Sequence, residues 1–330
     1  MATYKEAGVD ISTGEEFVRR IKPIVRETFS PHVLSDIGHF GAFFDAHFPD
    51  YTHPVLVSSV DGVGTKLRVA VAMQKYDTIG QDLVNHCVND IAVCGAKPLY
   101  FLDYYAAAKL DLNAAVEVVK GFAKACSENG CSLIGGETAE MPTIYDEGDF
   151  DVAGMIVGVV EKDKIITGAG IQKGDVLVGM ASSGLHTNGY SLMRTALLGK
   201  YHVDSYVKEL EQTVGDALLT IHKSYYSTIR LLIEHLDVRG FSHITGGGIV
   251  GNTMRIIPKG LSISVNWNTW QQQPIFQFIQ NAGSVPDEEM RSAFNLGIGC
   301  IAIVAPKDVD RAMAIIFGQN EKPYVIGEVV

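Results

Sequence analysis

A short loop with an acid at one end and a base at the other is the first place in this chain where chemistry can be expected. Residues Ser59–Lys66 read SVDGVGTK and continue directly from an apolar run. Two glycines beside Asp61 and Lys66 are typical of a loop that handles phosphate, because glycine lets backbone amides approach an anion and lysine adds a positive charge. The spacing differs from that of the common GxxxxGK[ST] phosphate loop, so other groups must define what this loop holds.

Three carboxylates at the ends of predicted elements are the first residues that could act together with this loop. Asp61 ends a predicted strand, Asp90 lies near the end of a predicted helix, and Glu137 follows another strand in LIGGETAEM. Oxygen ligands of this kind suit Mg²⁺, which fills its remaining positions with waters and substrate phosphates. The three residues together predict a magnesium site.

The helix predicted over residues 77–94 carries one of these acids on a polar side. At about 100° per residue, Asp82, His86, Asn89 and Asp90 fall opposite the apolar positions. In an isolated helix such a side is ordinarily a solvated face, and that interpretation competes with a functional one.

Two further glycine-bearing loops offer donors for phosphate. They read SSGLHTNGYS at 182–191 and HITGGGIVGN at 243–252, and each precedes a predicted helix start. Backbone amides at a helix start bind phosphate, but glycines of this kind also make ordinary tight turns. The candidate residues are Ser183, Gly184, His186, Asn188, Thr245, Gly246, Gly247 and Gly248.

The elements that must position these loops alternate along the chain. Strands are predicted at 54–60, 98–106, 131–136, 151–162, 175–183, 261–267 and 297–306, where β-branched and aromatic residues cluster. Helices are predicted at 14–26, 77–94, 113–129, 189–199, 207–236, 269–281 and 308–317. A polar, glycine-bearing stretch at 161–173 marks the boundary between two domains. The segment 203–240 contains no recognisable motif.

Composition narrows the classes of function. The 330 residues are 47% hydrophobic and 20% charged, and the formal charge of −11 argues against nucleic acid as a partner. No apolar run is long enough to span a membrane, and MATYKEAGVD lacks the regions of a signal peptide, so we expect a cytoplasmic location. Five cysteines without CxxC spacing predict neither a disulfide framework nor a metal site.

Longer blocks in the chain resemble the phosphoribosylformylglycinamidine cyclo-ligase family, also called aminoimidazole ribonucleotide synthetases. The blocks include YKEAGVDI, IGHFGAF, SSVDGVGTKL, LDYYA, GGETAEMP, SSGLHTNGYSL and HITGGGIVGN, in order from Tyr4 onward. DGVGTK, NDI and GGE are shared with a wider superfamily of ATP-using enzymes that includes thiamine-monophosphate kinase and selenophosphate synthetase. AGVD, LDYYA, GGETAEMP and SSGLHTNGYSL narrow the resemblance to the cyclo-ligase.

The resemblance implies a reaction and roles for the residues above. Formylglycinamidine ribonucleotide, the small-molecule substrate, would react with ATP through an iminophosphate to give aminoimidazole ribonucleotide, ADP and phosphate. Metal ligands would be Asp61, Asp90 and Glu137; the nucleotide would contact Asp61, Gly62, Gly64, Thr65, Lys66, Asn89 and Gly136. Lys66 would place a point charge beside the phosphates, and the two later loops would bind substrate or phosphate.

The resemblance also implies an α+β architecture of two mixed α/β domains, over 1–165 and 166–330. The first would pair with its mate into a β-barrel across a homodimer and bind ATP, and the second would bind substrate or phosphate. His186 could act as a general acid or base or as a donor to phosphate, and His243 could equally serve packing. A segment at 34–50 could close over nucleotide or be a plain connector. Because IVGNTMRII lacks an acid that some relatives place there, roles beyond Gly248 are not carried over.

Two other classes of function compete with this interpretation. Another ATP-using enzyme of the superfamily would share Asp61 and Asp90 but pass phosphate to a different acceptor. A nucleotide-binding scaffold without catalysis would not need the full set of acids together with Lys66, and the sequence contains all of them.

Overall fold

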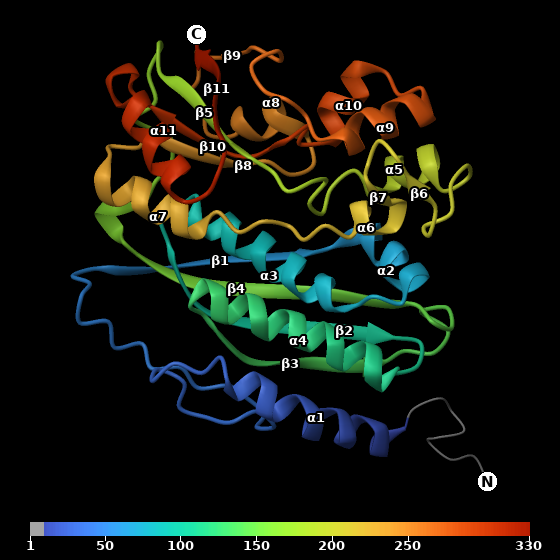
Figure 1. The fold of residues 1–330 in the computed structure, drawn as a ribbon. Helices are drawn as coiled ribbons and strands as arrows, with labels where there is room; N and C mark the ends of the chain where they lie inside the picture. Colours follow the sequence, from blue (N-terminus) through green and yellow to red (C-terminus); the bar gives the residue numbers. More distant parts are fainter. Residues whose placement is uncertain (1–9) are drawn as a thin grey trace. The chain divides into compact units, whose positions relative to one another are not determined.

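The computed structural model describes residues 10–330 and divides the chain into two compact units. The first unit runs to Ile91 and continues from Lys97 to Glu161; the second comprises 92–96 and Lys162–Val330. Figure 1 shows the elements of both. The YKEAGVDI block lies almost wholly outside the described residues. The structure moves the start of the second unit to Lys162, from the sequence-based 166, and adds the short segment 92–96 to it.

A four-stranded mixed sheet forms the centre of the first unit. Its order is β1-β4-β2-β3; β4 pairs antiparallel with both β1 and β2, whereas β3 pairs parallel with β2. The strands are β1 (Pro54–Gly62), β2 (Lys97–Ala107), β3 (Ser132–Glu140) and β4 (Phe150–Glu161). Among the described residues, this sheet has two open edges and is not closed into a barrel.

Four helices within residues 10–330 belong to the first unit, and α4 begins and ends at capping residues. The helices are α1 (Ile11–Arg26), α2 (Leu67–Met73), α3 (Asp77–Ala92) and α4 (Leu112–Asn129), with a 3₁₀ turn η1 at Gly64–Lys66. Asp111 caps α4 by accepting hydrogen bonds from the amides of Asn113 and Ala114, and Gly130 ends it in a left-handed conformation. The parallel β2–β3 connection is the one that contains α4, as a parallel crossover requires.

Helices α3 and α4 approach each other at the level of the backbone. A Cβ added at Gly80 would lie 2.2 Å from the Val118 carbonyl oxygen and 2.4 Å from the Phe122 amide nitrogen. Gly121 is equally confined, since its Cβ would lie 2.5 Å from the Asp77 carbonyl oxygen. The glycines therefore permit a helix contact that no other residue would allow.

Every residue of α3 from Thr78 to Asn89 is buried, including the polar ones. The expectation of an ordinary solvated face on this helix is wrong. Buried polar groups need hydrogen-bond partners, and Asn85 has one within the first unit, since its Oδ1 accepts from Asn129 Nδ2 at 2.8 Å. The helix thus holds a polar network inside the fold.

The second unit is built on a five-stranded antiparallel sheet of order β8-β10-β5-β11-β9. Its strands are β5 (Val176–Ala181), β8 (Gly240–His243), β9 (Ile263–Val265), β10 (Ile298–Val304) and β11 (Pro323–Val329); β6 (Tyr206–Val207) and β7 (Gln212–Thr213) form a separate hairpin. Its helices are α5 (Tyr190–Leu197), α6 (Val214–Leu218), α7 (Tyr226–His235), α8 (Gly248–Thr253), α9 (Pro274–Gly283), α10 (Asp287–Ala293) and α11 (Val309–Gly318). Two 3₁₀ turns, η2 (Lys162–Lys164) and η3 (Pro306–Asp308), complete the unit.

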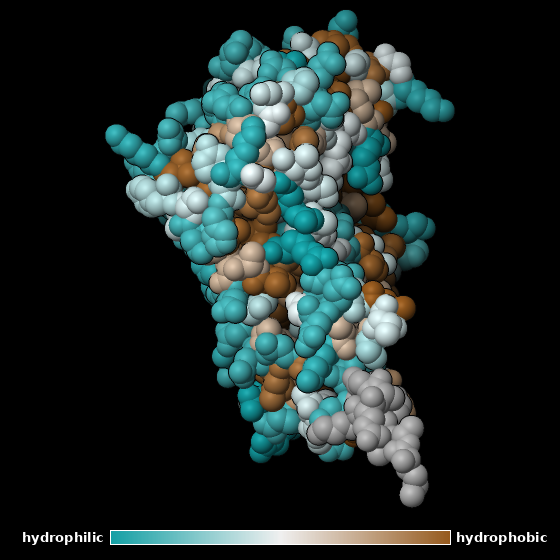
Figure 2. All heavy atoms as spheres, turned by 90° about the vertical axis from the view of Figure 1, so that its right-hand side faces the viewer, coloured by the Kyte–Doolittle hydropathy of each residue, from teal (hydrophilic) through white to brown (hydrophobic). Residues whose placement is uncertain are grey.

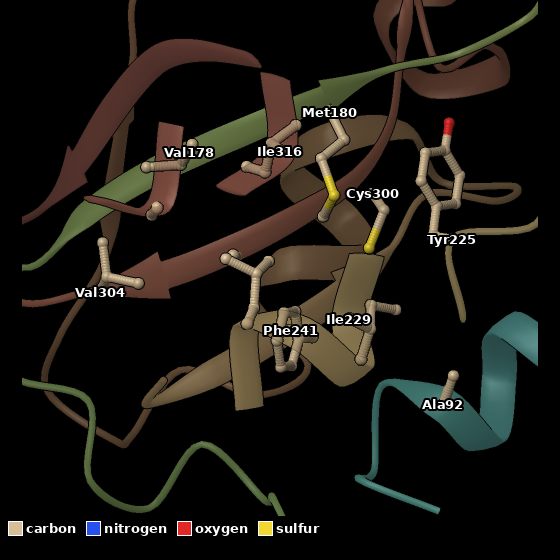
Figure 3. Packing of buried hydrophobic residues seen from close by; sticks show 12 residues of the cluster. Ala92, Val178, Met180, Tyr225, Ile229, Phe241, Cys300, Val304 and Ile316 are labelled. Carbon is tan, nitrogen blue, oxygen red and sulfur yellow. The ribbon is translucent and has the colours of Figure 1, made fainter. Parts of the chain in front are cut away.

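Both faces of this sheet are buried, which explains why β10 is apolar at every position but one. Cys300, Ala302 and Val304 belong to one core cluster, and Ile301 and Ile303, which alternate with them, belong to another. Figure 3 shows part of the first cluster: Val178, Met180, Tyr225, Ile229, Phe241, Cys300, Val304 and Ile316. The sheet therefore acts as the rigid middle layer of the second unit.

The largest error of the sequence-based assignment falls between residues 207 and 236. A single helix is predicted there, but the structure has the β6–β7 hairpin, the short α6, an irregular stretch and then α7. Thr213 caps α6 by accepting from the Asp216 amide, so the helix begins only after the hairpin. The strands β8 and β11 and the helices α2 and α10 are also absent from the prediction.

Apolar side chains are exposed on the outward side of β1. Leu56 is 59% and Val60 65% exposed, and residues of this strand alternate between exposed and half-buried. Figure 2 shows brown apolar patches among teal polar side chains on the face that it presents. No helix among the described residues is long and apolar enough to cross a membrane.

We predict that Gly80→Ala destabilises the protein by about 2 kcal/mol or more, because the added methyl group would meet backbone atoms that cannot move alone. The higher helix propensity of alanine, worth about 1 kcal/mol, would not compensate. Urea denaturation gives the free energy of unfolding. Gly14→Ala in α1 is the matched control, since a Cβ there meets no described atom within 4 Å. Equal stability of Gly80→Ala and the wild type would contradict the close helix contact.

Candidate functional site

The acidic end of the DGVGTK loop lies against helix α3. Asp61 is the last residue but one of β1, and its Oδ2 lies 2.8 Å from Nε2 of His86. The same His86 nitrogen lies 3.9 Å from Asp90 Oδ2. Ser59 Oγ donates to Asp90 Oδ2 at 2.8 Å, and the Gly62 amide donates to Asp61 Oδ1 at 2.7 Å. The structure thus brings together two of the three predicted metal ligands around one imidazole.

The electrostatics around this imidazole favour positive charge. Burial alone would lower the pKa of His86, but the hydrogen bond to Asp61 and the charges of Asp90, Asp61 and Asp82 outweigh it and leave the pKa raised. Burial alone would raise the pKa of Asp61, yet the His86 hydrogen bond and charge and the Gly62 amide leave it lowered. Two oxygen ligands that attract a cation are the donor set that Mg²⁺ requires, so these residues fit the ion.

Glu137 does not join this pair. Across the sheet, Asp61 pairs with Gly154, Gly154 with Asp103, and Asp103 with Gly136, the neighbour of Glu137. Three steps between strands of about 4.8 Å each separate the two ends by about 14 Å. One ion held directly by all three predicted ligands is therefore not what the structure shows.

The basic end of the loop is occupied by a salt bridge. Lys66 is fully buried, and its Nζ lies 2.9 Å from Oδ1 and 2.8 Å from Oδ2 of Asp82, which is fully buried as well. Burial lowers the pKa of Lys66, against the opposing charge and hydrogen bond of Asp82. The expected contact of Lys66 with phosphate would require its ammonium group to exchange this partner.

Most of the predicted nucleotide contacts lie on consecutive elements of the first unit. Gly62 ends β1, and Gly64 and Thr65 form η1 with Lys66. Asn89 is fully buried in α3, while Gly136 is exposed in β3. A Cβ at Gly136 would lie 2.3 Å from Asp103 Oδ1, so this glycine lets the two strands accommodate the carboxyl group.

A cavity of about 1000 Å³ in the first unit is lined by α1, the 36–44 segment and residues of β2 and β3 that include Gly136 and Glu137. Its lining is mostly apolar, with contributions from phenylalanines and leucines, and contains no lysine or arginine among the described residues. Burial raises the pKa of Asp103, which also lines it, to about 7. Sequence reasoning identified the 34–50 segment as a lid or connector, and the structure shows that it forms cavity wall.

The two later loops lie beside each other in the second unit. Asn188 Oδ1, from SSGLHTNG, accepts from the Gly246 amide at 2.8 Å. Ser183 donates through Oγ to the Ile221 carbonyl oxygen at 2.6 Å, and Asn295 Nδ2 donates to the Gly184 carbonyl oxygen at 2.8 Å. These bonds hold Ser183, Gly184 and Asn188 of the first loop against neighbouring segments.

The amides of the triple glycine all have partners within the protein. Besides Gly246, the Gly247 amide donates to the Ser292 carbonyl oxygen at 3.0 Å and the Gly248 amide to the Thr245 carbonyl oxygen at 3.2 Å. Gly247 and Gly248 have φ of 101° and 64°, values that favour glycine. These glycines form a tight turn in this conformation, and a phosphate role for the loop stays a prediction.

Asn252 holds this turn, although sequence reasoning assigned it no role. Its Nδ2 lies 3.2 Å from the Thr245 and Gly246 carbonyl oxygens and 2.9 Å from that of Gly248, and its Oδ1 accepts from Thr245 Oγ1 at 3.0 Å. The Asn252 side chain thus bonds to three residues of the turn, Thr245, Gly246 and Gly248. In the sequence, the only indication of this role is a side-chain amide four residues after Gly248.

His186 is fully buried and has a φ of 61°, which is uncommon for a residue with a side chain. Its Nε2 accepts from the Ser183 amide at 3.3 Å. Its ring stacks on His222, a residue of the motif-free segment that sequence reasoning missed. The His186 side chain therefore packs against its own loop and against His222.

Comparison with known proteins follows the same division of the chain. The family models "AIR synthase related protein, N-terminal domain" and "AIR synthase related protein, C-terminal domain" match residues 45–160 and 172–330. A phosphoribosylformylglycinamidine cyclo-ligase from Thermoanaerobacter pseudethanolicus is 50% identical over 329 residues, 99% of this chain and 97% of that protein. This chain belongs to the AIR synthase family. A second family member with that name, from Carboxydothermus hydrogenoformans, is 50% identical over 99% of this chain and 96% of its own.

Solved structures place the AIR synthase family chain in a wider fold group. A thiamine-monophosphate kinase from Stenotrophomonas maltophilia superposes with a TM-score of 0.71 at 14% identity, covering 94% of this chain and 93% of the other. The hydrogenase maturation protein HypE in complex with ATP superposes with a TM-score of 0.65 at 16% identity, covering 98% and 87%. At these identities the likeness establishes the shared fold.

We predict that either Lys66→Met or Asp82→Leu lowers the free energy of unfolding by about 3–5 kcal/mol, because each leaves one buried charge without its partner. The double variant should recover most of that loss, and urea denaturation measures all three. Lys120→Met, which breaks the exposed pair with Glu117, is the control and should change stability by less than about 1 kcal/mol. Additive losses in the double variant would show that the two charges do not depend on each other.

Proposed function

We propose that the protein catalyses the ATP-dependent ring closure of formylglycinamidine ribonucleotide to 5-aminoimidazole ribonucleotide, with release of ADP and phosphate, in purine biosynthesis. The observation that carries this proposal is the identity of about half of all residues, over nearly the full length, with relatives that share the cyclo-ligase name. The acids of the DGVGTK loop and of α3 and both substrate-side loops are present in the chain. A kinase with the same fold would not be expected to share about half of its residues with cyclo-ligases.

The reaction proceeds in two steps that conserve all atoms. The formyl oxygen of the substrate attacks the γ-phosphorus of ATP, and the bond to ADP breaks, which gives an iminophosphate. The neighbouring amidine nitrogen then attacks the formyl carbon, the carbon–oxygen bond to phosphate breaks, and the imidazole ring closes. One proton leaves the formamide nitrogen in the first step, and one leaves the amidine nitrogen in the second. The protein must hold two phosphorylated molecules in line and exclude water from the intermediate.

Residues of the first unit support a role in ATP and magnesium binding. Asp61 and Asp90 would hold Mg²⁺, since the structure places both carboxylates beside the same imidazole, that of His86. Bound magnesium would neutralise phosphate oxygens during transfer. Glu137, about 14 Å across the sheet, would act at a separate point along the nucleotide, and the apolar cavity beside it suits a base.

The first test of the function is a paired assay of ADP release and aminoimidazole product, with purified protein, MgATP and formylglycinamidine ribonucleotide. We expect equal amounts of both products. Asp61→Asn should lower turnover at least about 100-fold, because the metal clamp on a transferring phosphoryl group contributes several kcal/mol. Asp204→Asn, an exposed acid in the second unit, is the control and should retain activity. ADP release that requires thiamine phosphate instead of the expected substrate would transfer the assignment to a kinase.

We also propose that the protein is a homodimer whose first units pair through β1 into a shared barrel. β1 is an edge strand, and its outward residues Leu56 and Val60 are well exposed. An uncovered apolar edge strand is a liability in a monomer, so a second copy of the chain is the occupant that explains it.

Sedimentation equilibrium at micromolar concentration should give twice the 35.8 kDa chain mass for the wild type. Val60→Lys should shift the mass toward a single chain, because the charge would be buried on association. Phe317→Lys replaces an exposed apolar residue of α11 and should leave the mass unchanged. A single-chain mass for the wild type would refute the dimer.

A further inference from the structure

His222 connects the two loops that are predicted to bind substrate. It lies in the irregular stretch between α6 and α7, and it is fully buried. Its Nδ1 lies 3.2 Å from Thr187 Oγ1 in the first loop, and its Nε2 lies 3.1 Å from Nε2 of His243, which begins the second loop. Its ring also stacks on His186, with centroids 4.1 Å apart and planes at 18°.

The backbone of the central sheet makes room for this arrangement. A Cβ at Gly299 of β10 would lie 2.5 Å from Cε1 of His186 and 2.1 Å from the hydroxyl oxygen of Tyr225. The pairing of β10 with β5 is irregular at this position, between Ile298 and Cys300. A glycine in β10 therefore leaves the space that the His186 ring occupies in the stack.

The contact between the two Nε2 atoms ties the proton of one ring to that of the other. A nitrogen–nitrogen hydrogen bond needs one donor and one acceptor, so only one of the two Nε2 atoms can carry its proton within the bond. On the far side of His222, the Thr187 hydroxyl can either accept from or donate to Nδ1. A change of tautomer at His222 therefore requires a matching change at His243.

Other ionisable side chains lie near these rings. Burial raises the pKa of Tyr225 and of Cys300, which pairs with His243 across β8 and β10, so both stay neutral. Lys223 and Glu321 form an ion pair with Nζ and Oε2 3.2 Å apart, and Lys223 lies over the Tyr225 ring. Imidazole can carry its proton on either of its two ring nitrogens, so these three side chains can change tautomer.

We propose that His222 is a positioning residue for the reaction, which sets the tautomer of His243 and the ring plane of His186 and so gives the two substrate loops one defined proton arrangement. This inference rests on the proposed function, because it assumes that both loops bind the substrate. His222 itself need not touch the substrate. Its segment is the part of the second unit where the sequence showed no motif.

Three substitutions separate its contacts. His222→Phe keeps an aromatic ring on His186 but removes both nitrogens; His222→Gln keeps a polar group near the position of Nε2; His222→Asn keeps one near the position of Nδ1. We expect kcat to fall on the order of tenfold in the Phe and Asn variants, with the KM for ATP unchanged, and to recover in the Gln variant. The pH profile of kcat should shift in the Phe variant and remain close to the wild type in the Gln variant.

Nitrogen-15 spectra of labelled histidine provide a readout that does not depend on turnover. The Nε2 resonance of His243 should move when His222 is replaced by Phe, because its hydrogen-bond partner is lost. His202→Gln, an exposed histidine paired with Asp204, is the control for assay and spectra and should change neither.

The outcomes distinguish the inference from the function on which it rests. If the wild-type protein shows no cyclo-ligase turnover, the proposed function is wrong. The spectra would still test the tautomer coupling. An unchanged His243 resonance in His222→Phe would overturn the coupling. Equal losses of kcat in all three variants, in proportion to their loss of thermal stability, would reduce His222 to a packing residue and overturn the proposal.

Discussion

The buried ion pair between Lys66 and Asp82 is the interaction on which the first unit depends. A charge without water is costly, and each partner is tolerated inside only because the other lies within 2.9 Å. The pair ties the DGVGTK loop to α3, and α3 in turn places His86 against Asp61. The glycine contact between α3 and α4 holds these two helices close together, so the position of His86 and Asp90 on α3 follows from helix packing.

Much of the fold could be predicted from local patterns, and the failures have local causes. Seven of the strands were recognised because β-branched and aromatic residues cluster between turn residues, as in β1 and β4. The helix expected over 207–236 failed because an apolar period persists across a chain that turns at Thr213 and again before Tyr226. β11 was overlooked because its sequence is interrupted by a glycine, although the strand lies inside the sheet between β5 and β9.

The site could be predicted as a set of residues but not as a geometry. Motif spacing identified Asp61, Asp90 and the two later loops, and the structure brings the two acids together and places the loops side by side. Spacing could not reveal that Lys66 has an internal partner, because Asp82 is one of many acids in the sequence. Nor could it reveal His222, since three imidazoles become neighbours only when a glycine in β10 leaves space for them.

The five residues 92–96, which interrupt the first unit and belong to the second, have a consequence for how the chain is made. The chain passes between the units at three points, after Ile91, after Ala96 and after Glu161. Ala92 is part of a core cluster whose other members are synthesised more than eighty residues later. During synthesis, all strands of the first unit's sheet are therefore made before the residues that pack against Ala92. Neither half is a self-contained piece of sequence, and a cut at residue 161 would not yield two intact modules.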